Sequence, residues 1–202
     1  MRTLTIDCAT EMCSVALFDD GVLIAEYAAL LGRGHAEALV PMIAALPGRG
    51  QAQRIIVARG PGSFTGVRIG LAAAKALQLA WDAELLAYAT PALVAAQALE
   101  EHKGPVDVAM TGGHGEWFVA LFDANGAALG EVVSLTPETA AAQSRAPLVA
   151  GTEAEALVAL RGSGTALMAR PLASNVMLLN AAQLSTDLSP LYGRAPDARL
   201  PA

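Results

Sequence analysis

The chain opens with three short segments whose hydrophobic positions are typical of β-strands. In the second segment, apolar and small residues alternate between the two sides from Cys13 to Asp19. Asp19, Asp20 and Gly21 then form a polar, glycine-containing turn that favours a hairpin. The pattern therefore predicts an antiparallel meander of three strands, at residues 3–7, 13–19 and 22–27.

Helical spacing begins after a glycine-rich break at residues 32–34. Residues 35–46 are predicted to form a helix despite Pro41. A proline is tolerated in the first turns of a helix and produces a kink farther along. A Pro-Gly-Arg-Gly run at 47–50 ends this helix. The segments that follow are predicted as strand, helix, strand and helix, at residues 54–58, 66–81, 85–87 and 91–101.

A polar break at residues 102–105 precedes a second half that partly repeats the pattern. Strands are predicted at 106–110, 116–123, 132–133 and 148–150, and helices at 137–143, 153–161 and 173–183. Residues 190–202 contain three prolines and are predicted to be extended. This order predicts two α/β lobes of similar topology, at 1–101 and 102–202, with one irregular α/β domain as the alternative.

Composition narrows the classes of protein that such a fold could serve. With 54% hydrophobic and 16% charged residues, the 202-residue chain can bury a real core. The net charge of −6 and the scattered arginines do not predict a basic patch, so tight direct binding of RNA or DNA is not expected. Cys8 and Cys13 match no zinc spacing and are expected to be reduced, buried thiols. Asp7 interrupts the first apolar run, so we expect a cytoplasmic protein without a signal peptide or membrane span.

The most distinctive stretch is a glycine-rich turn between the strand at 54–58 and the helix at 66–81. It reads Gly60, Pro61, Gly62, Ser63, Phe64, Thr65, Gly66. Its glycines permit backbone angles closed to other residues, and Ser63 or Thr65 can cap the helix through its hydroxyl. A phosphate loop is one interpretation, because free N–H groups gather at a helix N-terminus. The turn lacks the Walker A lysine and the third glycine of the dinucleotide fingerprint, so a capped turn that binds nothing is the alternative.

Two of the predicted helices carry few polar positions. In the helix at 66–81 these are Arg68, Lys75 and Gln78, which share one narrow face. In the helix at 35–46, Glu37 is nearly alone as a charge. One face of each helix must cover a sheet, and the apolar surface that remains predicts an association surface. The alternative is that both helices are buried in a two-layer core.

Residues suited to catalysis are scarce in this chain. Its three histidines, among them His35 at a helix start, lie in no metal-binding spacing. We expect His35 to cap or pack rather than to catalyse. Asp7 ends the first strand and Thr10 lies in the turn after it, where actin-like ATPases and sugar kinases place an acidic residue that faces the metal–nucleotide complex. A turn-forming aspartate at a sheet end is the alternative.

Four blocks of the sequence resemble the TsaB (YeaZ) family, in the family's order. They are the strand pair at residues 6–17, the helix start at 32–43, the glycine turn at 60–70 and the segment at 192–199. The last block reads Tyr-Gly-Arg-Ala-Pro-Asp-Ala-Arg, against a family pattern of Y-x-R-x-P-D-A-K. Only the glycine turn is specific by itself, but together the blocks span nearly the whole chain.

The resemblance implies an actin-like/ribonuclease-H-like α/β fold with two similar lobes, each a mixed sheet with flanking helices. It implies a role in forming N6-threonylcarbamoyladenosine at position 37 of tRNAs that read codons beginning with A. In that pathway the metal-binding paralogue TsaD transfers the threonylcarbamoyl group, and the TsaB-like chain is its non-catalytic partner. A TsaE-type ATPase binds the pair. ATP and tRNA are therefore expected to meet this chain only through the complex, with no cofactor or metal of its own.

The resemblance also implies where the partner binds, because family dimers form through the first two helices. These are the helices that their composition already singles out. The implied interface residues are His35, Leu39, Met42, Ile43, Val67, Arg68, Leu71, Ala74, Lys75 and Gln78. A homodimer through the same helices is expected when the partner is absent.

The chain departs from the family in two places. The link between the first helix and the strand at residue 55 is shorter than usual, and residues 111–114 read Thr-Gly-Gly-His where relatives often have Asp-Ala-Arg. Two other functions stay open as alternatives. Asp7 and the glycine turn would suit a nucleotide-binding enzyme of the actin-like class, and an older label of the family is a glycopeptidase-like metalloprotease. The sequence contains no His-x-x-x-His pair, which argues against the protease.

Overall fold

The computed structural model describes residues 1–193, in which two five-stranded sheets form. Residues 194–202 lie outside the described residues, and with them most of the predicted extended tail and of the resemblance at 192–199. The first sheet has the order β3-β2-β1-β4-β5. Its strands are β1 (Arg2–Asp7), β2 (Met12–Asp19), β3 (Val22–Leu30), β4 (Arg54–Ala58) and β5 (Glu84–Tyr88).

The predicted meander is confirmed, since β1, β2 and β3 pair antiparallel. Its hairpin turn uses positive φ angles of 46° at Asp20 and 79° at Gly21, the conformation that a two-residue hairpin loop requires. On the other side of β1 the strands β4 and β5 run parallel to it. Because β1 and β2 are buried on both faces, residues such as Leu4, Ile6 and Val15 are fully inaccessible to solvent.

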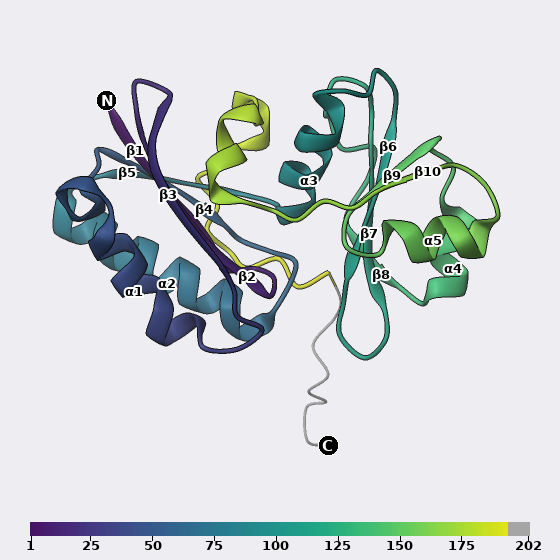
Figure 1. Ribbon diagram of the computed structural model, residues 1–202, viewed down its shortest axis with the longest axis horizontal. Coiled ribbons are helices and arrows are strands. Elements are labelled where there is room, and N and C mark those ends of the chain that lie inside the picture. Colours follow the sequence, from purple (N-terminus) through teal and green to yellow (C-terminus); the bar gives the residue numbers. More distant parts are fainter. Residues whose placement is uncertain (194–202) are drawn as a thin grey trace.

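Helices α1 (His35–Ala45) and α2 (Phe64–Trp81) lie side by side on one face of this sheet (Figure 1). Helix α1 continues through Pro41 to Ala45, and the 3₁₀ turn η1 (Pro47–Gly50) ends it as predicted. Helix α2 begins at Phe64, two residues before the predicted start. The inward rows of both helices complete the core of the first lobe.

The second sheet, of order β10-β9-β6-β7-β8, repeats the topology of the first. Its strands are β6 (Val106–Thr111), β7 (Trp117–Phe122), β8 (Val133–Leu135), β9 (Leu148–Ala150) and β10 (Thr165–Leu167). Again three strands are antiparallel and two continue parallel to the first of them. Helices α4 (Pro137–Gln143) and α5 (Ala154–Arg161) pack on its outer face. The expectation of two similar lobes is confirmed.

The space between the two sheets is filled by α3 (Thr90–Leu99) and by a segment that returns from the second lobe (Figure 1). That segment is not the single helix predicted at 173–183. It forms two 3₁₀ turns, η2 (Ala173–Leu178) and η3 (Ala181–Gln183). The break is at Leu179 and Asn180, which are extended, and the Asn180 side chain accepts a hydrogen bond from the N–H of Ala182. Asparagine favours such a capping position over a helix interior.

Two segments cross the expected lobe boundary between residues 101 and 102. Helix α3 belongs to the first lobe by sequence but packs mainly on β6 and β7. In the other direction, η2 packs on β1 and β2, and Ser185 forms a β-bridge with Ala87. The division into 1–101 and 102–202 stays a prediction, and the crossing segments join the two lobes. In residues 1–193 none of the helices combines the length and the apolar character needed to cross a bilayer.

Candidate functional site

The glycine turn joins β4 to α2 and is held against the turn between β1 and β2. Ser63 is the N-cap of α2, and its Oγ accepts a hydrogen bond of 3.2 Å from the N–H of Gly66. Thr65, the other predicted cap, lies inside the first helical turn. The N–H of Ser63 donates to the carbonyl oxygen of Ala9 at 2.6 Å. The capped strand-to-helix turn expected from the sequence is therefore present.

Two glycines of this turn are required by close backbone packing. A Cβ on Gly62 would lie 1.8 Å from the carbonyl oxygen of Ala9, and one on Gly66 would lie 2.0 Å from that of Cys8. Real Cβ atoms do not approach a backbone oxygen so closely, so neither position has room for a side chain. Packing against the β1–β2 turn thus accounts for both glycines without a phosphate.

At the start of α2, the exposed ring of Phe64 takes part in a small aromatic cluster. The guanidinium carbon of Arg68 lies 3.6 Å from the centroid of the Phe64 ring, a cation–π contact. Its Nε donates to the hydroxyl of Tyr192 at 3.1 Å, and the two rings are 5.4 Å apart. This cluster ties residues near the end of the described chain to the helix that carries the predicted interface.

Asp7 and Thr10, the candidates for a nucleotide site, are both engaged by the chain itself. One carboxylate oxygen of Asp7 accepts from the N–H of Ala9 at 2.9 Å, and the other from the hydroxyl of Tyr88 at 2.6 Å. Asp7 is fully buried, and its cross-strand neighbour Ser14 accepts from the N–H of Ala173 in η2. Thr10 accepts from the N–H of Met12. The returning segment and Tyr88 therefore cover the carboxylate, which supports the turn-forming interpretation.

Sequence reasoning missed Tyr88, which is the residue that completes this arrangement. Tyr88 ends β5 and pairs with Ala58 at the end of β4, so it lies two strands from Asp7 at the same edge of the sheet. The strand ends could have indicated this contact, because the carboxyl ends of parallel strands meet at one edge. The sequence pattern predicts the end of β5 one residue too early, at Ala87.

We expect Asp7→Asn to raise the stability of the chain at neutral pH. Burial raises the pKa of Asp7 from 3.8 to about 6, partly offset by the hydrogen bonds from Tyr88 and Ala9. The folded state therefore binds the proton of Asp7 more tightly than the unfolded state does. The stability that this proton contributes is lost as pH rises through about 6. The neutral amide should recover about 1–3 kcal/mol at pH near 7.5.

Chemical denaturation of both proteins at several pH values tests this expectation. The advantage of Asp7→Asn should shrink as pH falls below the folded pKa of about 6, because the wild-type carboxyl then becomes neutral too. A loss of stability in Asp7→Asn at neutral pH that disappears as the pH falls would instead mean that the folded chain needs the carboxylate as an ion.

The ten predicted interface residues do not form one surface. Six of them are buried within the chain, so the prediction that they face a partner is wrong for these six: His35, Leu39, Ile43, Val67, Leu71 and Ala74. They form the inward rows of α1 and α2, and the Nε2 of His35 lies 2.9 Å from the carbonyl oxygen of Thr10. Arg68 and Lys75 are exposed, and Met42 and Gln78 are half-buried.

The outward rows of the two helices are nevertheless apolar. Leu79 is 88% exposed and Val40 is 62% exposed. Around them the outward positions hold small or aliphatic residues, namely Ala36, Pro41, Ala44, Ala45, Ala72, Ala76 and Ala80. We call this surface of α1 and α2, with Val40 and Leu79 as its largest side chains, the outer helix face. The sequence located the helices correctly but selected the residues of their inward rows.

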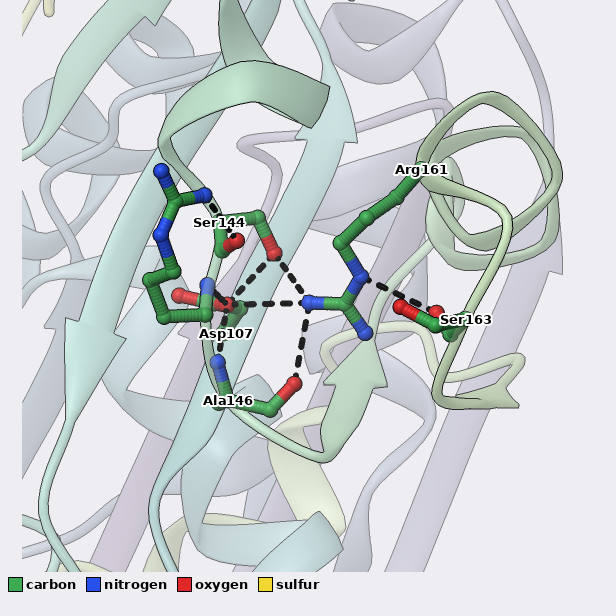
Figure 2. A network of polar contacts seen from close by, with 6 residues as sticks. Asp107, Ser144, Ala146, Arg161 and Ser163 are labelled. Carbon is green, nitrogen blue, oxygen red and sulfur yellow. Dashed lines mark hydrogen bonds and ion pairs between the residues drawn. The ribbon is translucent and has the colours of Figure 1, made fainter.

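A second buried polar cluster lies in the other lobe and was not found from the sequence (Figure 2). Asp107 on β6 accepts from the hydroxyl of Ser144 at 2.5 Å and from the N–H groups of Arg145 and Ala146, both at 2.8 Å. Arg161, at the end of α5, donates to Ser144 Oγ at 2.7 Å and lies 3.7 Å from the Asp107 carboxylate. These polar groups are hydrogen-bond partners of one another, and together they hold the α4–β9 link against α5.

The divergent loop at 111–114 closes on its own lobe. Thr111 donates from its hydroxyl to Glu153 at 2.6 Å, and the N–H of Gly112 donates to the carbonyl oxygen of Glu116 at 2.9 Å. The Glu116 carboxylate accepts from the hydroxyl of Ser134. Elsewhere too, residues 1–193 contain no group of three or more His, Cys, Asp or Glu side chains placed to hold a metal ion.

Solved structures of similar architecture define the class of protein. YeaZ from Pseudomonas aeruginosa is 27% identical with a TM-score of 0.75, over 88% of this chain and 89% of that one. The ethanolamine utilization protein EutJ from Carboxydothermus hydrogenoformans has a TM-score of 0.51 at 13% identity, over 89% and 90% of the two chains, and shows the fold alone. The chain is a two-lobed α/β protein of the actin-like/ribonuclease-H-like class.

Sequence comparison narrows this class to a family. A family model described as "TsaD: tRNA N6-adenosine threonylcarbamoyltransferase" matches residues 29–177. The tRNA threonylcarbamoyladenosine biosynthesis protein TsaB of Escherichia coli K12 is 39% identical over 95 residues, 45% of this chain and 41% of that protein. TsaB of Bacillus subtilis 168 is 30% identical over 139 residues, 66% and 60% of the two. The chain belongs to the TsaB (YeaZ) family, although these matches span only about half the length of the curated relatives.

Proposed function

We propose that this chain supports the formation of N6-threonylcarbamoyladenosine in tRNA as the non-catalytic partner of a TsaD-type threonylcarbamoyltransferase. The pathway is suggested by the names of its TsaB relatives. The observation that carries the partner role is the outer helix face. An apolar surface of this kind on a monomer is typical of an association site.

The composition of the outer helix face suits a helix-bearing protein partner. Leu79 is 88% exposed and Val40 62% exposed, and the alanines between them allow a second helix to approach closely. Covering a leucine side chain is worth about 1.5–3 kcal/mol, so these residues can anchor an interface. Arg68 and Lys75 lie exposed on α2 and would provide charged contacts at the rim.

The closed surroundings of Asp7 support a role without catalysis. Its carboxylate is fully buried and accepts hydrogen bonds from Tyr88 and Ala9. A carboxylate that helps to bind a metal–nucleotide complex needs an open approach from the space between the lobes, which η2 and α3 occupy here. We therefore assign nucleotide and group-transfer chemistry to the partners.

Within this proposal, the chain pairs with the TsaD-type protein in the cytoplasm, and a TsaE-type ATPase binds the pair. ATP is then consumed through that ATPase, and tRNA is contacted through the complex. The modified tRNAs would be those that read codons beginning with A. The isolated chain would pair with itself through the outer helix face. These details rest on the family resemblance.

The first experiment mixes the purified chain with the TsaD-type protein of the same organism and measures molar mass by light scattering after gel filtration. We expect a one-to-one complex that forms at the expense of any homodimer. If the two proteins elute separately at micromolar concentration, the partner role is wrong, and ATP binding by the isolated chain should be measured next.

Leu79→Asp is expected to weaken this complex by about 100-fold or more, because a charge would replace the most exposed apolar side chain of the outer helix face. The residue is solvent-exposed in the monomer, so the thermal stability of the isolated chain should hardly change. Leu160→Asp on α5 is the matched control: Leu160 is 55% exposed, and α5 lies at the opposite end of the molecule (Figure 1). Equal binding by Leu79→Asp and wild type would show that the partner uses another surface.

A further inference from the structure

We propose that Cys8 and Cys13 form a reversible intramolecular disulfide, with a low-molecular-weight disulfide such as oxidised glutathione as the oxidant. The site is the turn between β1 and β2. The proposal does not depend on the proposed function, because it concerns only the chemistry and stability of this chain.

The end of the β1–β2 ladder brings the two cysteines close together. In the β1–β2 ladder, Asp7 pairs with Ser14 as the last pair before the turn. Cys8 directly follows Asp7 and Cys13 directly precedes Ser14, and their Sγ atoms lie 3.6 Å apart in a thiol–thiol hydrogen bond. Directly opposed residues of an antiparallel pair have Cα separations of about 4.5–5.5 Å, within the range that a disulfide spans. The Sγ atoms need to approach by about 1.5 Å to reach the bond length of a disulfide.

The turn that the disulfide would close supports both helices of the first lobe. The carbonyl oxygen of Ala9 accepts from Ser63 at the start of α2, and that of Thr10 contacts the ring of His35 at the start of α1. The carbonyl oxygen of Glu11 accepts from Leu31 and Gly32, just before α1. A bond between Cys8 and Cys13 would thus fix the segment on which the N-terminal ends of α1 and α2 rest.

Both exchange steps can be written with the groups present. Hydrogen bonding by the Cys8 thiol lowers the pKa of Cys13 and raises that of Cys8, which favours Cys13 as the attacking thiolate. The Cys13 thiolate attacks one sulfur of the oxidant, forms a mixed disulfide and releases one thiolate. Cys8 then loses its proton to solvent and attacks Cys13 Sγ, which forms the intramolecular bond and releases a second thiolate. The oxidant gains the two electrons that the two cysteines lose.

The competing interpretation is that both cysteines are ordinary core residues. Cys8 is 1% exposed and Cys13 is fully buried, so the oxidant reaches them only when the turn opens. Glu11 and Met12, at the tip of the turn, are half-exposed, so this opening involves a surface segment. A buried thiol pair that merely packs would resist bridging in the native state, whereas the proposed pair should be bridged more readily in the native than in the unfolded chain.

The test equilibrates the full chain with glutathione redox buffers of defined ratio, in native conditions and in denaturant, followed by acid quench, thiol alkylation and mass spectrometry. Equilibrium should be approached from both the reduced and the oxidised chain. The chain has 2 cysteines, so loss of both alkylation sites in a monomer identifies this bond. We expect the equilibrium constant for forming the disulfide to be at least about 10-fold larger in the native state than in denaturant. This is the effect expected of a loop-closing bond that fits the fold. The proposal would be overturned if the disulfide were less favoured in the native state than in the unfolded chain.

Thermal unfolding gives an independent measurement of the same linkage. The oxidised chain should melt about 4–8 °C above the reduced chain, given the loop that the disulfide closes and the size of the protein. Cys13→Ser serves as the control, because it can form only a mixed disulfide with glutathione and should show no such rise. A lower melting temperature for the oxidised chain would mean that the native geometry opposes the bond.

Discussion

Gly66→Ala is expected to destabilise the chain by about 3 kcal/mol or more, although alanine favours a helix by about 1 kcal/mol over glycine. Gly66 lies in the first turn of α2, where helix propensity alone predicts a gain. The added Cβ would lie 2.0 Å from the carbonyl oxygen of Cys8. The Cys8 oxygen belongs to the backbone of the turn that follows β1 and cannot move aside as a side chain can, so α2 must shift away from this turn.

Gly70→Ala on the same helix is the matched control for this prediction. A Cβ on Gly70 would meet its nearest neighbour, the Cβ of Cys8, at 3.6 Å, which is ordinary van der Waals contact. We therefore expect Gly70→Ala to be neutral or stabilising, and urea denaturation should separate the two variants clearly. If Gly66→Ala were as stable as Gly70→Ala, the close packing of the glycine turn on Cys8 would be wrong.

Most strands and helices could be predicted because each carries its own local signal. The strands β4 and β9 and the helix α4 have the predicted bounds, since turn residues or prolines delimit each of them. Strand β10 could not be found in this way. It has three residues, Thr165–Leu167, and exists because β9 offers a free parallel edge, which is a property of the sheet rather than of the segment.

The two apolar helices of the candidate site could be predicted from the sequence, but the residues that they expose could not. Large aliphatic residues such as Leu39 and Leu71 attract attention in a sequence, and the same property draws them into the chain's own core. Periodicity could have separated the two faces: Leu39 and Ile43 lie four residues apart on the inward row, which leaves Val40 outward. A partner surface consists of apolar residues that the core leaves exposed. The fold must therefore be known before such a surface can be identified.

Contacts between distant segments set the limit of the sequence analysis. The sequence shows Asp7 as a strand-end carboxylate, but its partner Tyr88 is 81 residues away and only the sheet brings them together. The contact between Cys8 and Cys13, by contrast, is local, because the two residues flank the last pair of one hairpin ladder. The Asp107 cluster is intermediate in the sequence distance between its members, because its groups come from a strand, a loop and a helix end of one lobe.

Asp107→Ala is expected to cost about 3–5 kcal/mol of stability, the loss typical of breaking a buried charged network by removing one member. The carboxylate is 4% exposed and accepts from the Ser144 hydroxyl and from two backbone N–H groups (Figure 2). Without it, those N–H groups lose their acceptor, and Arg161, whose side chain is 10% exposed, loses its counter-charge.

A double-mutant cycle distinguishes this network from simple loss of packing. Arg161→Met keeps most of the side-chain volume and removes the charge, so the pair Asp107→Ala with Arg161→Met no longer leaves a buried cation unpaired. We therefore expect the double variant to be more stable than the sum of the two single losses by about 1–3 kcal/mol, measured by chemical denaturation. Strict additivity would mean that Arg161 stabilises the lobe only through Ser144, Ala146 and Ser163, to which it also donates hydrogen bonds. The coupling energy thus measures whether the 3.7 Å ion pair itself holds α5 to β6.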